Sequence, residues 1–472
     1  MIAASDADWL ALTPNGFFAA SHRDTDLLAI VRGIEVTTIG QVHQSLLNPD
    51  LVREALAGDP DGEVKRASEV VNLDKVLGAG PPPAVAITSH EPGSRSQKDL
   101  VTVAARITDR GKGIGRIEWR INGVTAGVMS APDGLGPDHN VKQELALEPG
   151  NNQIEVIAYE GRNLLASLPA QAALVYDGPA DAVKPKLYIL AIGINDYVDR
   201  GGEDPASGEF LLFPPLYASV PDAEAFSAEM KGAGSGQYAQ VHVDLALDRD
   251  ATVAKLDETI RRLANEIGPR DTFVFYAAAH GYTVEGKYYM IPQDYQGGPD
   301  PVAIKTLGIG QDRIQDWIAN RIKAKRALIL LDTCESGALT GGYAKSRTGG
   351  PVSEAAVGRL NEATGRPVLT AASPGKHAFE DYKGHGVFTY ALMEALHKGD
   401  TNNNGKIEVS ELAAHIEKRV PQLFAELKQS GWVVKGLAAA PLRRGESEKE
   451  DTTQTAHFGS TGEDFSIVAL LP

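Results

Sequence analysis

Residues 327–331 form a short apolar run that stops at Asp332 and is followed closely by Cys334. An apolar run of this length, bounded by polar residues and by Gly337, is typical of a buried strand in a parallel sheet. In open α/β sheets, binding and catalytic residues gather at the carboxyl ends of such strands. We therefore expect Cys334, the only cysteine of the chain, at a place where chemistry is common.

A second buried-strand pattern, residues 271–276, runs through three alanines into His280 and Gly281. A lone cysteine is usually a small buried apolar residue, and a lone histidine is usually a hydrogen-bonded bystander. A nucleophile and a base at the ends of two strands of one sheet are much harder to obtain by chance. Together, the two motifs predict a Cys–His pair.

The surrounding sequence predicts strands that alternate with helices. Strands are expected at 187–194, 241–247, 271–276, 327–331 and 367–372, and helices at 222–231, 251–267, 314–324, 385–397 and 408–427. This alternation predicts an α/β/α sandwich, in which helices cover both faces of a mostly parallel sheet.

The region before residue 178 predicts a different architecture. Apolar residues alternate with a period of two between residues 84 and 176, as in an all-β, immunoglobulin-like sandwich. Residues 1–57 suggest a small β-element and a helix at about 45–57. We divide the chain into an N-terminal segment with linker, the sandwich, the α/β domain and a C-terminal extension, at residues 1–80, 81–178, 186–430 and 431–472.

Composition narrows the setting and the partners. The 472 residues carry a formal net charge of −16, which argues against general nucleic-acid binding. A single cysteine excludes an intramolecular disulfide and a cysteine-based zinc site, and favours a reducing, cytoplasmic compartment. We expect no signal peptide and no membrane association, because the first residues lack a basic stretch and no run of about 18 apolar residues occurs.

Several ordered motifs carry a family resemblance. They are 187–197 (LYILAIGINDY), 276–281 (YAAAHG), 289–294 (YMIPQD), 326–337 (RALILLDTCESG) and 384–396 (GHGVFTYALMEAL). They resemble the bacterial caspase-like cysteine peptidases, the metacaspase-like and orthocaspase-like relatives of the caspases, over about 186–430. A histidine about 50 residues before the cysteine is also expected of caspase-type proteases. The chain departs at Ala279, where relatives commonly have glycine.

The resemblance implies a catalytic role for three residues. Cys334 would be the nucleophile, and His280 the general base and later the general acid. The backbone N–H groups of Gly281 and Cys334 are our candidates for the oxyanion site, although Gly281 is also explained as a turn residue. The chemistry requires no cofactor.

The resemblance also suggests what the peptidase would cut. In metacaspase-like relatives an acidic residue at the position of Asp332 lines the S1 pocket and selects Arg or Lys, and Asp222 matches a second acidic position. Two carboxylates would bind a guanidinium through charge-assisted hydrogen bonds. Asp332 is alternatively a strand-end turn residue, and Asp222 a helix N-cap. Ser373 and Glu380 are further candidates for the same cleft.

Two further readings concern regulation and partners. If the P1 residue is basic, residues 338–366 are a candidate self-cleavage segment of a zymogen, with Lys345 and Arg347 as the first choices. The expected partners are protein substrates with exposed Arg or Lys sites, and a regulatory protein bound through the sandwich. The rival hypothesis is a catalytically silent caspase-like module that serves as a binding or signalling scaffold.

Residues 400–411 fit the calcium-loop pattern D-x-N-x-N-G-x₅-E between two expected helices. Such a loop also forms an Asp-Asn-Gly turn with no metal, so Ca²⁺ is an expectation with a plain alternative. The candidate ligand positions are Asp400, Asn402, Asn404, Lys406, Glu408 and Glu411.

Overall fold

The computed structural model describes residues 2–3, 9–20, 28–32, 35–60, 62–91, 93–130, 138–178, 184–198, 213, 215–284, 287–297, 300–335, 349–350, 360–361, 364–371, 382–429, 456–459 and 464–470. Two compact units divide the chain, residues 1–182 with 461–463 and residues 183–460 with 464–472. Within the described ranges, every helix is too short or too polar to cross a membrane.

The first unit opens with short strands and helices. These are β1 (Ile2–Ala3), β2 (Trp9–Leu12), β3 (Phe18–Ala20), β4 (Ala29–Arg32), β5 (Glu35–Thr38), α1 (Ile39–Leu46), α2 (Pro49–Leu56), α3 (Glu63–Val70) and α4 (Leu73–Leu77). Helix α2 corresponds to the helix expected at about 45–57, with its start at Pro49. The Asn48 side chain accepts a hydrogen bond from the Leu51 N–H (3.0 Å), and a new helix begins at Pro49, which favours a first helical position.

Two sheets complete this unit, in the orders β10-β9-β12-β13-β7 and β11-β8-β6. Their strands are β6 (Ala84–Ile87), β7 (Ser94–Ser96), β8 (Leu100–Thr108), β9 (Ile114–Ile121), β10 (Val124–Ser130), β11 (Asp138–Ala146), β12 (Gly150–Glu160) and β13 (Ala170–Tyr176). Alternate residues of both sheets share one core with Trp119, so the expected all-β region is a sandwich of two sheets. The Gln41 side chain of α1 donates to the Ala166 carbonyl (2.9 Å). The short N-terminal elements are thereby tied to the sandwich.

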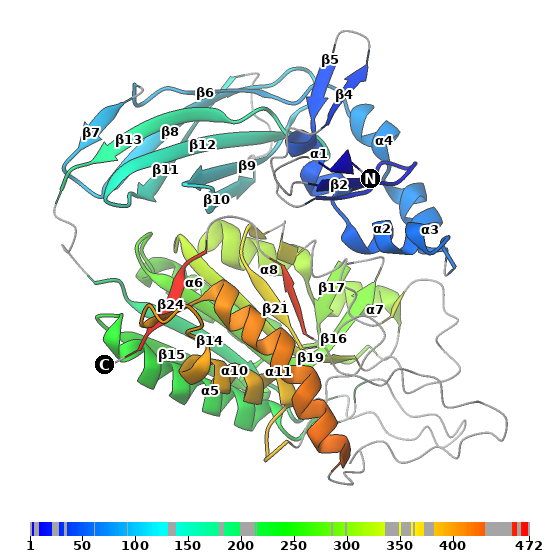
Figure 1. Cartoon of the computed structure of the whole chain (residues 1–472), viewed down its shortest axis with the longest axis vertical. Helices are drawn as coiled ribbons and strands as arrows, with labels where there is room; N and C mark the ends of the chain where they lie inside the picture. Colours follow the sequence, from blue (N-terminus) through cyan, green and yellow to red (C-terminus); the bar gives the residue numbers. More distant parts are fainter. Residues whose placement is uncertain are drawn as a thin grey trace. The chain divides into compact units, whose positions relative to one another are not determined.

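The second unit contains a nine-stranded sheet with the main order β15-β14-β16-β19-β21-β23 (Figure 1). Its strands are β14 (Leu187–Gly193), β15 (Val241–Leu247), β16 (Thr272–Val284), β17 (Lys287–Met290), β18 (Ile309–Gly310), β19 (Arg326–Glu335), β20 (Gly349–Gly350), β21 (Val368–Thr370) and β23 (His457–Gly459). Strands β15, β14, β16, β19 and β21 are parallel, which confirms the expected parallel sheet. Strand β23 pairs antiparallel with β21.

Helices cover both faces of this sheet. They are α5 (Ser219–Ala233), α6 (Val253–Glu266), α7 (Pro301–Leu307), α8 (Gln311–Gln315), α10 (Val387–Lys398) and α11 (Val409–Gln429), with the short 3₁₀-helices η1 (Gly234–Gly236) and η2 (Asp248–Asp250) and the π-helix η3 (Asp316–Arg321). Phe273 and Phe275 of β16 face a core that includes α6 and η3 residues. Val274 and Tyr276 face a second core, which includes α5, α10 and α11 residues. The alternation follows from the period of two in a strand that is buried on both faces.

The C-terminal residues return to the second unit. Strand β24 (Ser466–Ala469) pairs antiparallel with β22 (Lys406–Glu408), which lies between α10 and α11. The Tyr238 hydroxyl after α5 donates to the Ile467 carbonyl (3.0 Å). The C-terminal strand is therefore part of the folded α/β unit.

Candidate active site

The two central strands extend beyond their neighbours. Strand β14 makes its last pair with β16 at Ala278, and β21 makes its last pair with β19 at Leu331. The β16–β19 ladder continues and pairs His280 with Cys334. Because neighbouring strands lie about 4.8 Å apart, the backbones of these two residues are adjacent.

Both strands continue past the apolar runs that indicated them. Strand β16 continues to Val284 and β19 continues to Glu335. The extension persists because β17 pairs antiparallel with residues 281–284 and supplies backbone hydrogen-bond partners that β14 no longer provides. His280 and Cys334 thus lie in a two-strand projection at the carboxyl edge of the sheet.

Aromatic side chains surround the His280 ring, which is 2% exposed. The backbone N–H of His280 donates to the Tyr197 hydroxyl (2.8 Å), and the ring centroids of these residues are 5.0 Å apart. The Phe213 ring centroid lies 5.6 Å from that of His280. The Tyr197 and Phe213 rings thus pack beside the imidazole and limit its movement.

Gly281 occupies a strand and not a turn. It pairs with Met290 of β17 on one side and with Glu335 of β19 on the other. The turn explanation for this glycine is therefore wrong, and Gly281 lies directly beside the His280–Cys334 pair.

Asp332 lies within β19, so its interpretation as a strand-end turn residue is also wrong. It is 7% exposed, and its Oδ2 atom accepts a hydrogen bond from the Thr389 hydroxyl of α10 (2.6 Å). The Thr389 hydroxyl is also 2.6 Å from the Tyr276 hydroxyl. A short polar network thus fixes the carboxylate two positions before Cys334.

Asp222 lies in the first turn of α5, whose N-cap is Ala218, so the N-cap reading is wrong. A Cβ at Gly193, at the end of β14, would lie 2.5 Å from the Ser219 carbonyl oxygen, so the start of α5 approaches the strand closely. The Asp222 Oδ1 atom is 2.7 Å from His385 Nδ1, and its Oδ2 accepts the Gly386 N–H (2.9 Å).

Asp222 and Asp332, here called the acidic pair, converge on one point. A Cβ at Gly386 would lie 2.9 Å from the Oδ2 atom of each carboxylate. Burial raises the pKa of Asp222, an effect that hydrogen bonds from His385 and Gly386 oppose. Burial and the two nearby carboxylates hold the pKa of Tyr276 well above its usual range. The acidic pair thus places two carboxyl groups together at one buried site.

Sequence reasoning missed three residues of this region, Tyr197, His385 and Thr389. All lie within the motifs 187–197 and 384–396, which gave the only signal. Their contacts span 83, 163 and 57 positions of the chain respectively.

Several expected features lie outside the described residues. These are Ser373, Glu380, the candidate cleavage residues Lys345 and Arg347, and most of the segment 338–366.

The candidate calcium loop forms a compact turn between α10 and α11. The Asp400 carboxylate accepts the N–H groups of Asn404 (3.0 Å) and Gly405 (2.9 Å). Glu411 accepts the Thr401 N–H (2.9 Å). A side-chain hydrogen bond between Glu408 and Glu411 raises the pKa of Glu408. Across the described ranges, groups of three or more His, Cys, Asp or Glu side chains arranged to hold a metal ion are absent.

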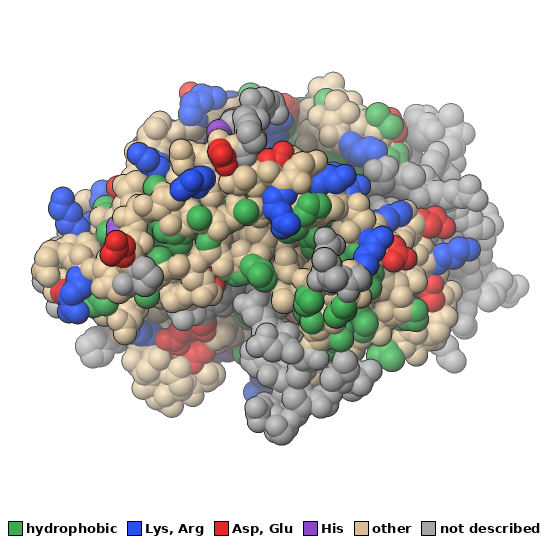
Figure 2. Space-filling model, turned by 90° about the horizontal axis from the view of Figure 1, so that it is seen from above, with side chains coloured by type: hydrophobic (Ala, Val, Ile, Leu, Met, Phe, Trp, Pro, Cys, Tyr) green, Lys and Arg blue, Asp and Glu red, His purple; other side chains and the backbone are tan. Residues whose placement is uncertain are grey.

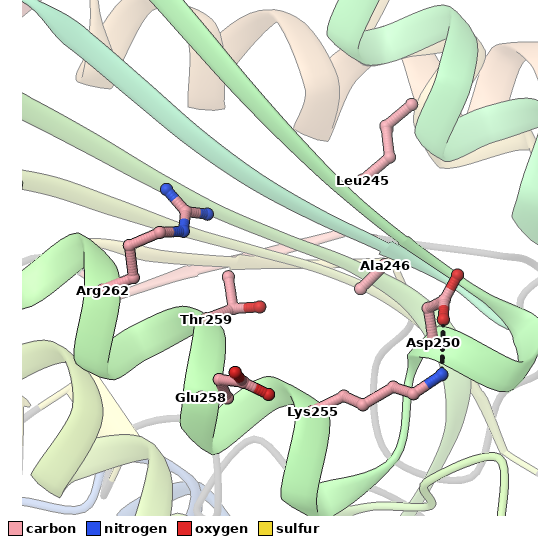
Figure 3. Close-up of a pocket in the computed structure, with 7 residues that line it drawn as sticks. All are labelled: Leu245, Ala246, Asp250, Lys255, Glu258, Thr259 and Arg262. Atoms are coloured by element: carbon pink, nitrogen blue, oxygen red, sulfur yellow. Dashed lines mark hydrogen bonds and ion pairs between the residues drawn. The ribbon is translucent and has the colours of Figure 1, made fainter.

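A cavity of about 400 Å³ lies elsewhere, between β15 and α6 (Figure 3). Its lining contains none of the predicted site residues. Figure 3 shows Lys255 directed at Asp250, at a distance of 2.6 Å. The lining residues are Leu245, Ala246, Asp250, Lys255, Glu258, Thr259 and Arg262.

The chain belongs to the caspase family of cysteine peptidases, because the caspase domain model matches residues 187–440. A crystal structure of a protein from Geobacter sulfurreducens is similar at 16% identity and a TM-score of 0.36, covering 59% of this chain and 94% of that one. Fibronectin(III)-like modules from Clostridium thermocellum match at 21% identity and a TM-score of 0.17, covering 21% of this chain and 47% of that one. The comparison with curated proteins gave no match.

Proposed function

We propose that this caspase-family chain is a metacaspase-like or orthocaspase-like endopeptidase that cuts after Arg or Lys. The observation that carries the proposal is the pairing of His280 with Cys334 on adjacent strands, beyond the ends of the flanking strands. The acidic pair, one member of which precedes Cys334 by two positions, supports a basic P1 residue.

The proposed mechanism follows from these positions. His280 takes the thiol proton of Cys334, and the thiolate attacks the carbonyl carbon of the scissile peptide. The backbone N–H groups of Gly281 and Cys334 bind the oxyanion. His280 returns its proton to the leaving amine, and water then hydrolyses the acyl-enzyme.

Short fluorogenic peptides with Arg, Lys or Asp at P1 test the proposal. We expect the Arg and Lys peptides to be cut with kcat/KM at least about 10²-fold higher than the Asp peptide, because two buried carboxylates repel a third. The Cys334→Ala variant should cut none. Turnover of the Asp peptide alone would overturn the assigned specificity.

The rival is a silent module that binds partners without cleaving them. It would be favoured by an absence of turnover together with an absence of Cys334 labelling by iodoacetamide. We further propose that a regulatory protein binds the sandwich and that this sandwich is of the immunoglobulin-like class. We also propose a cytoplasmic setting for the protein. Figure 2 shows acidic and basic side chains interspersed with apolar ones on the face it presents, a mixed surface suited to a protein partner.

Self-cleavage within 338–366 is the first regulatory prediction. Incubation of the purified wild-type protein should yield fragments that end at Lys345 or Arg347, because these basic residues fit the proposed P1 site. Mass spectrometry of the fragments, with Cys334→Ala as the control, measures this. Cleavage that persists in Cys334→Ala would show that this cysteine does not perform it.

The second regulatory prediction is that residues 400–411 bind calcium. The Glu408 and Glu411 side chains lie within hydrogen-bond distance of each other, and paired carboxylates of this kind are the oxygen ligands that Ca²⁺ takes. We expect millimolar Ca²⁺ to raise the Tm of the wild type and not that of Glu411→Gln, with a Kd on the order of 10⁻⁴ M. Because Glu411 also accepts backbone N–H groups, the measured quantity is the calcium-dependent change within each variant. Equal changes in both proteins would remove the site.

A further inference from the structure

A tight turn presents His385 to the acidic pair. The backbone N–H of Tyr382 donates to the His385 carbonyl (2.8 Å), and the backbone N–H of His385 donates to the Tyr382 carbonyl (3.1 Å). The two residues between them, Lys383 and Gly384, have φ angles of 55° and 87°. Two consecutive positive φ angles define a type I′ turn, the geometry that closes a two-residue hairpin. The backbone of His385 is thereby fixed.

The other polar groups of this turn are directed elsewhere. The Lys383 ammonium lies over the rings of Tyr382 (5.2 Å) and Tyr390 (4.9 Å), and it donates to the Tyr390 hydroxyl (3.0 Å). The Tyr382 hydroxyl donates to Glu426 (2.6 Å). Of the ionisable side chains in this turn, His385 is the one with a hydrogen bond to the acidic pair.

The His385 ring contacts the Asp222 oxygen that the backbone of Gly386 leaves uncovered. Its Nδ1 atom is 2.7 Å from Asp222 Oδ1, while Gly386 N–H already holds Oδ2. The Asp222 side chain is 3% exposed, whereas the His385 ring is 24% exposed and can exchange a proton with water. Two buried carboxylates at one site are costly unless a positive charge compensates them.

We propose that His385 is an internal counter-ion of Asp222, and that a basic P1 side chain replaces its charge, so that binding of a guanidinium releases the His385 proton to solvent. The inference rests on the proposed cleavage after Arg or Lys. It makes His385 a specificity-determining residue, because a neutral P1 side chain cannot replace the charge that His385 carries.

The electrostatic setting sets the direction of the pH dependence. The hydrogen bond to Asp222 raises the pKa of His385, an effect that burial opposes. Below this raised pKa the ligand must displace the proton of His385, so its affinity rises by up to about tenfold for each unit by which the pH increases. Above this pKa the affinity does not depend on pH. His385 contacts Asp222 directly, and the other ionisable groups of the acidic site and of the turn are Asp332, Tyr276, Tyr382, Lys383, Tyr390 and Glu426.

Calorimetric titration of benzamidine into the full-length Cys334→Ala chain tests this without catalysis. Titrations in phosphate and in Tris, whose ionisation enthalpies differ, give the number of protons released for each amidinium bound. Below the pKa of His385, we expect the release to approach one proton for each benzamidine bound. In that range the Kd should increase by up to about tenfold for each unit by which the pH falls. H385Q in the same background should bind with a nearly constant Kd and release no proton.

His397→Gln is the matched control, because His397 also pairs with a carboxylate (Glu229, 2.9 Å) but is exposed on α10. It should keep the proton release of the parent. If H385Q does not unfold cooperatively, H385N replaces it, since its amide nitrogen lies close to the place of Nδ1. Benzamidine binding without proton release by the parent chain would overturn the role of His385 and leave the basic specificity intact. No benzamidine binding at any pH would overturn both.

Discussion

The His280→Ala variant is expected to lose about 10³-fold in kcat/KM on a P1-Arg peptide at pH 7. Without the imidazole, the Cys334 thiol should titrate near its ordinary pKa of about 8.5, so only a few per cent is thiolate at neutral pH. The leaving amine would also lose its proton donor. Rates of iodoacetamide labelling between pH 5 and 9 measure the thiolate directly. Labelling of the variant should fall about tenfold per pH unit below 8.5, while the wild type stays reactive at lower pH.

His397→Ala serves as the control for this result, because His397 is an exposed histidine of α10 that lies outside the proposed catalytic machinery. It should retain wild-type turnover and labelling. If His280→Ala instead keeps turnover within about twofold of the wild type, His280 is not the base and the paired strands have another use.

The second large effect is expected at the acidic pair. Asp332→Asn keeps the shape and an acceptor for the Thr389 hydroxyl but removes the charge. Turnover of P1-Arg peptides should fall by roughly 10²-fold or more, because truncating one partner of a buried charge pair costs about 3 kcal/mol. At the same time the Tm should rise, since the variant relieves the repulsion between Asp222 and Asp332.

The opposite signs separate a substrate-binding role from a structural one. A carboxylate that merely stabilised the fold would lower both activity and Tm when neutralised. Asp312→Asn is the matched control, because Asp312 is exposed and pairs with Lys287 at the surface (2.8 Å). Its kcat/KM and Tm should remain close to those of the wild type. An unchanged kcat/KM for Asp332→Asn would remove Asp332 from the substrate site.

The sequence predicted the parallel sheet and the two motif strands well, because strands buried on both faces leave an unbroken apolar run. The adjacency of His280 and Cys334 was predicted from their places in two strands of one sheet, and the register bears it out. The apolar runs mark only the first part of each strand, and β16 continues through its hairpin with β17, which pairs with residues 281–284.

The contacts of His385 could not be predicted from spacing. Its motif contains two glycines, and a local reading indicates only a helix start. The type I′ geometry at Lys383 is invisible in the sequence, because lysine rarely adopts a positive φ angle. The contact with Asp222 then depends on how α5 packs against Gly193 at the end of β14. Long-range packing of this kind leaves no periodic pattern to detect.

The pairing of β23 with β21, and of β24 with β22, has a consequence for folding during synthesis on the ribosome. These strands are synthesised after the rest of the α/β unit, yet they pair with β21 at one side of the sheet and with the loop beside α10. Until they emerge, the nascent sheet keeps a bare β21 edge, to which other strands can add. Contacts as distant as Tyr238 with Ile467 also form slowly. The sheet therefore stays incomplete until residues 457–469 have left the exit tunnel of the ribosome.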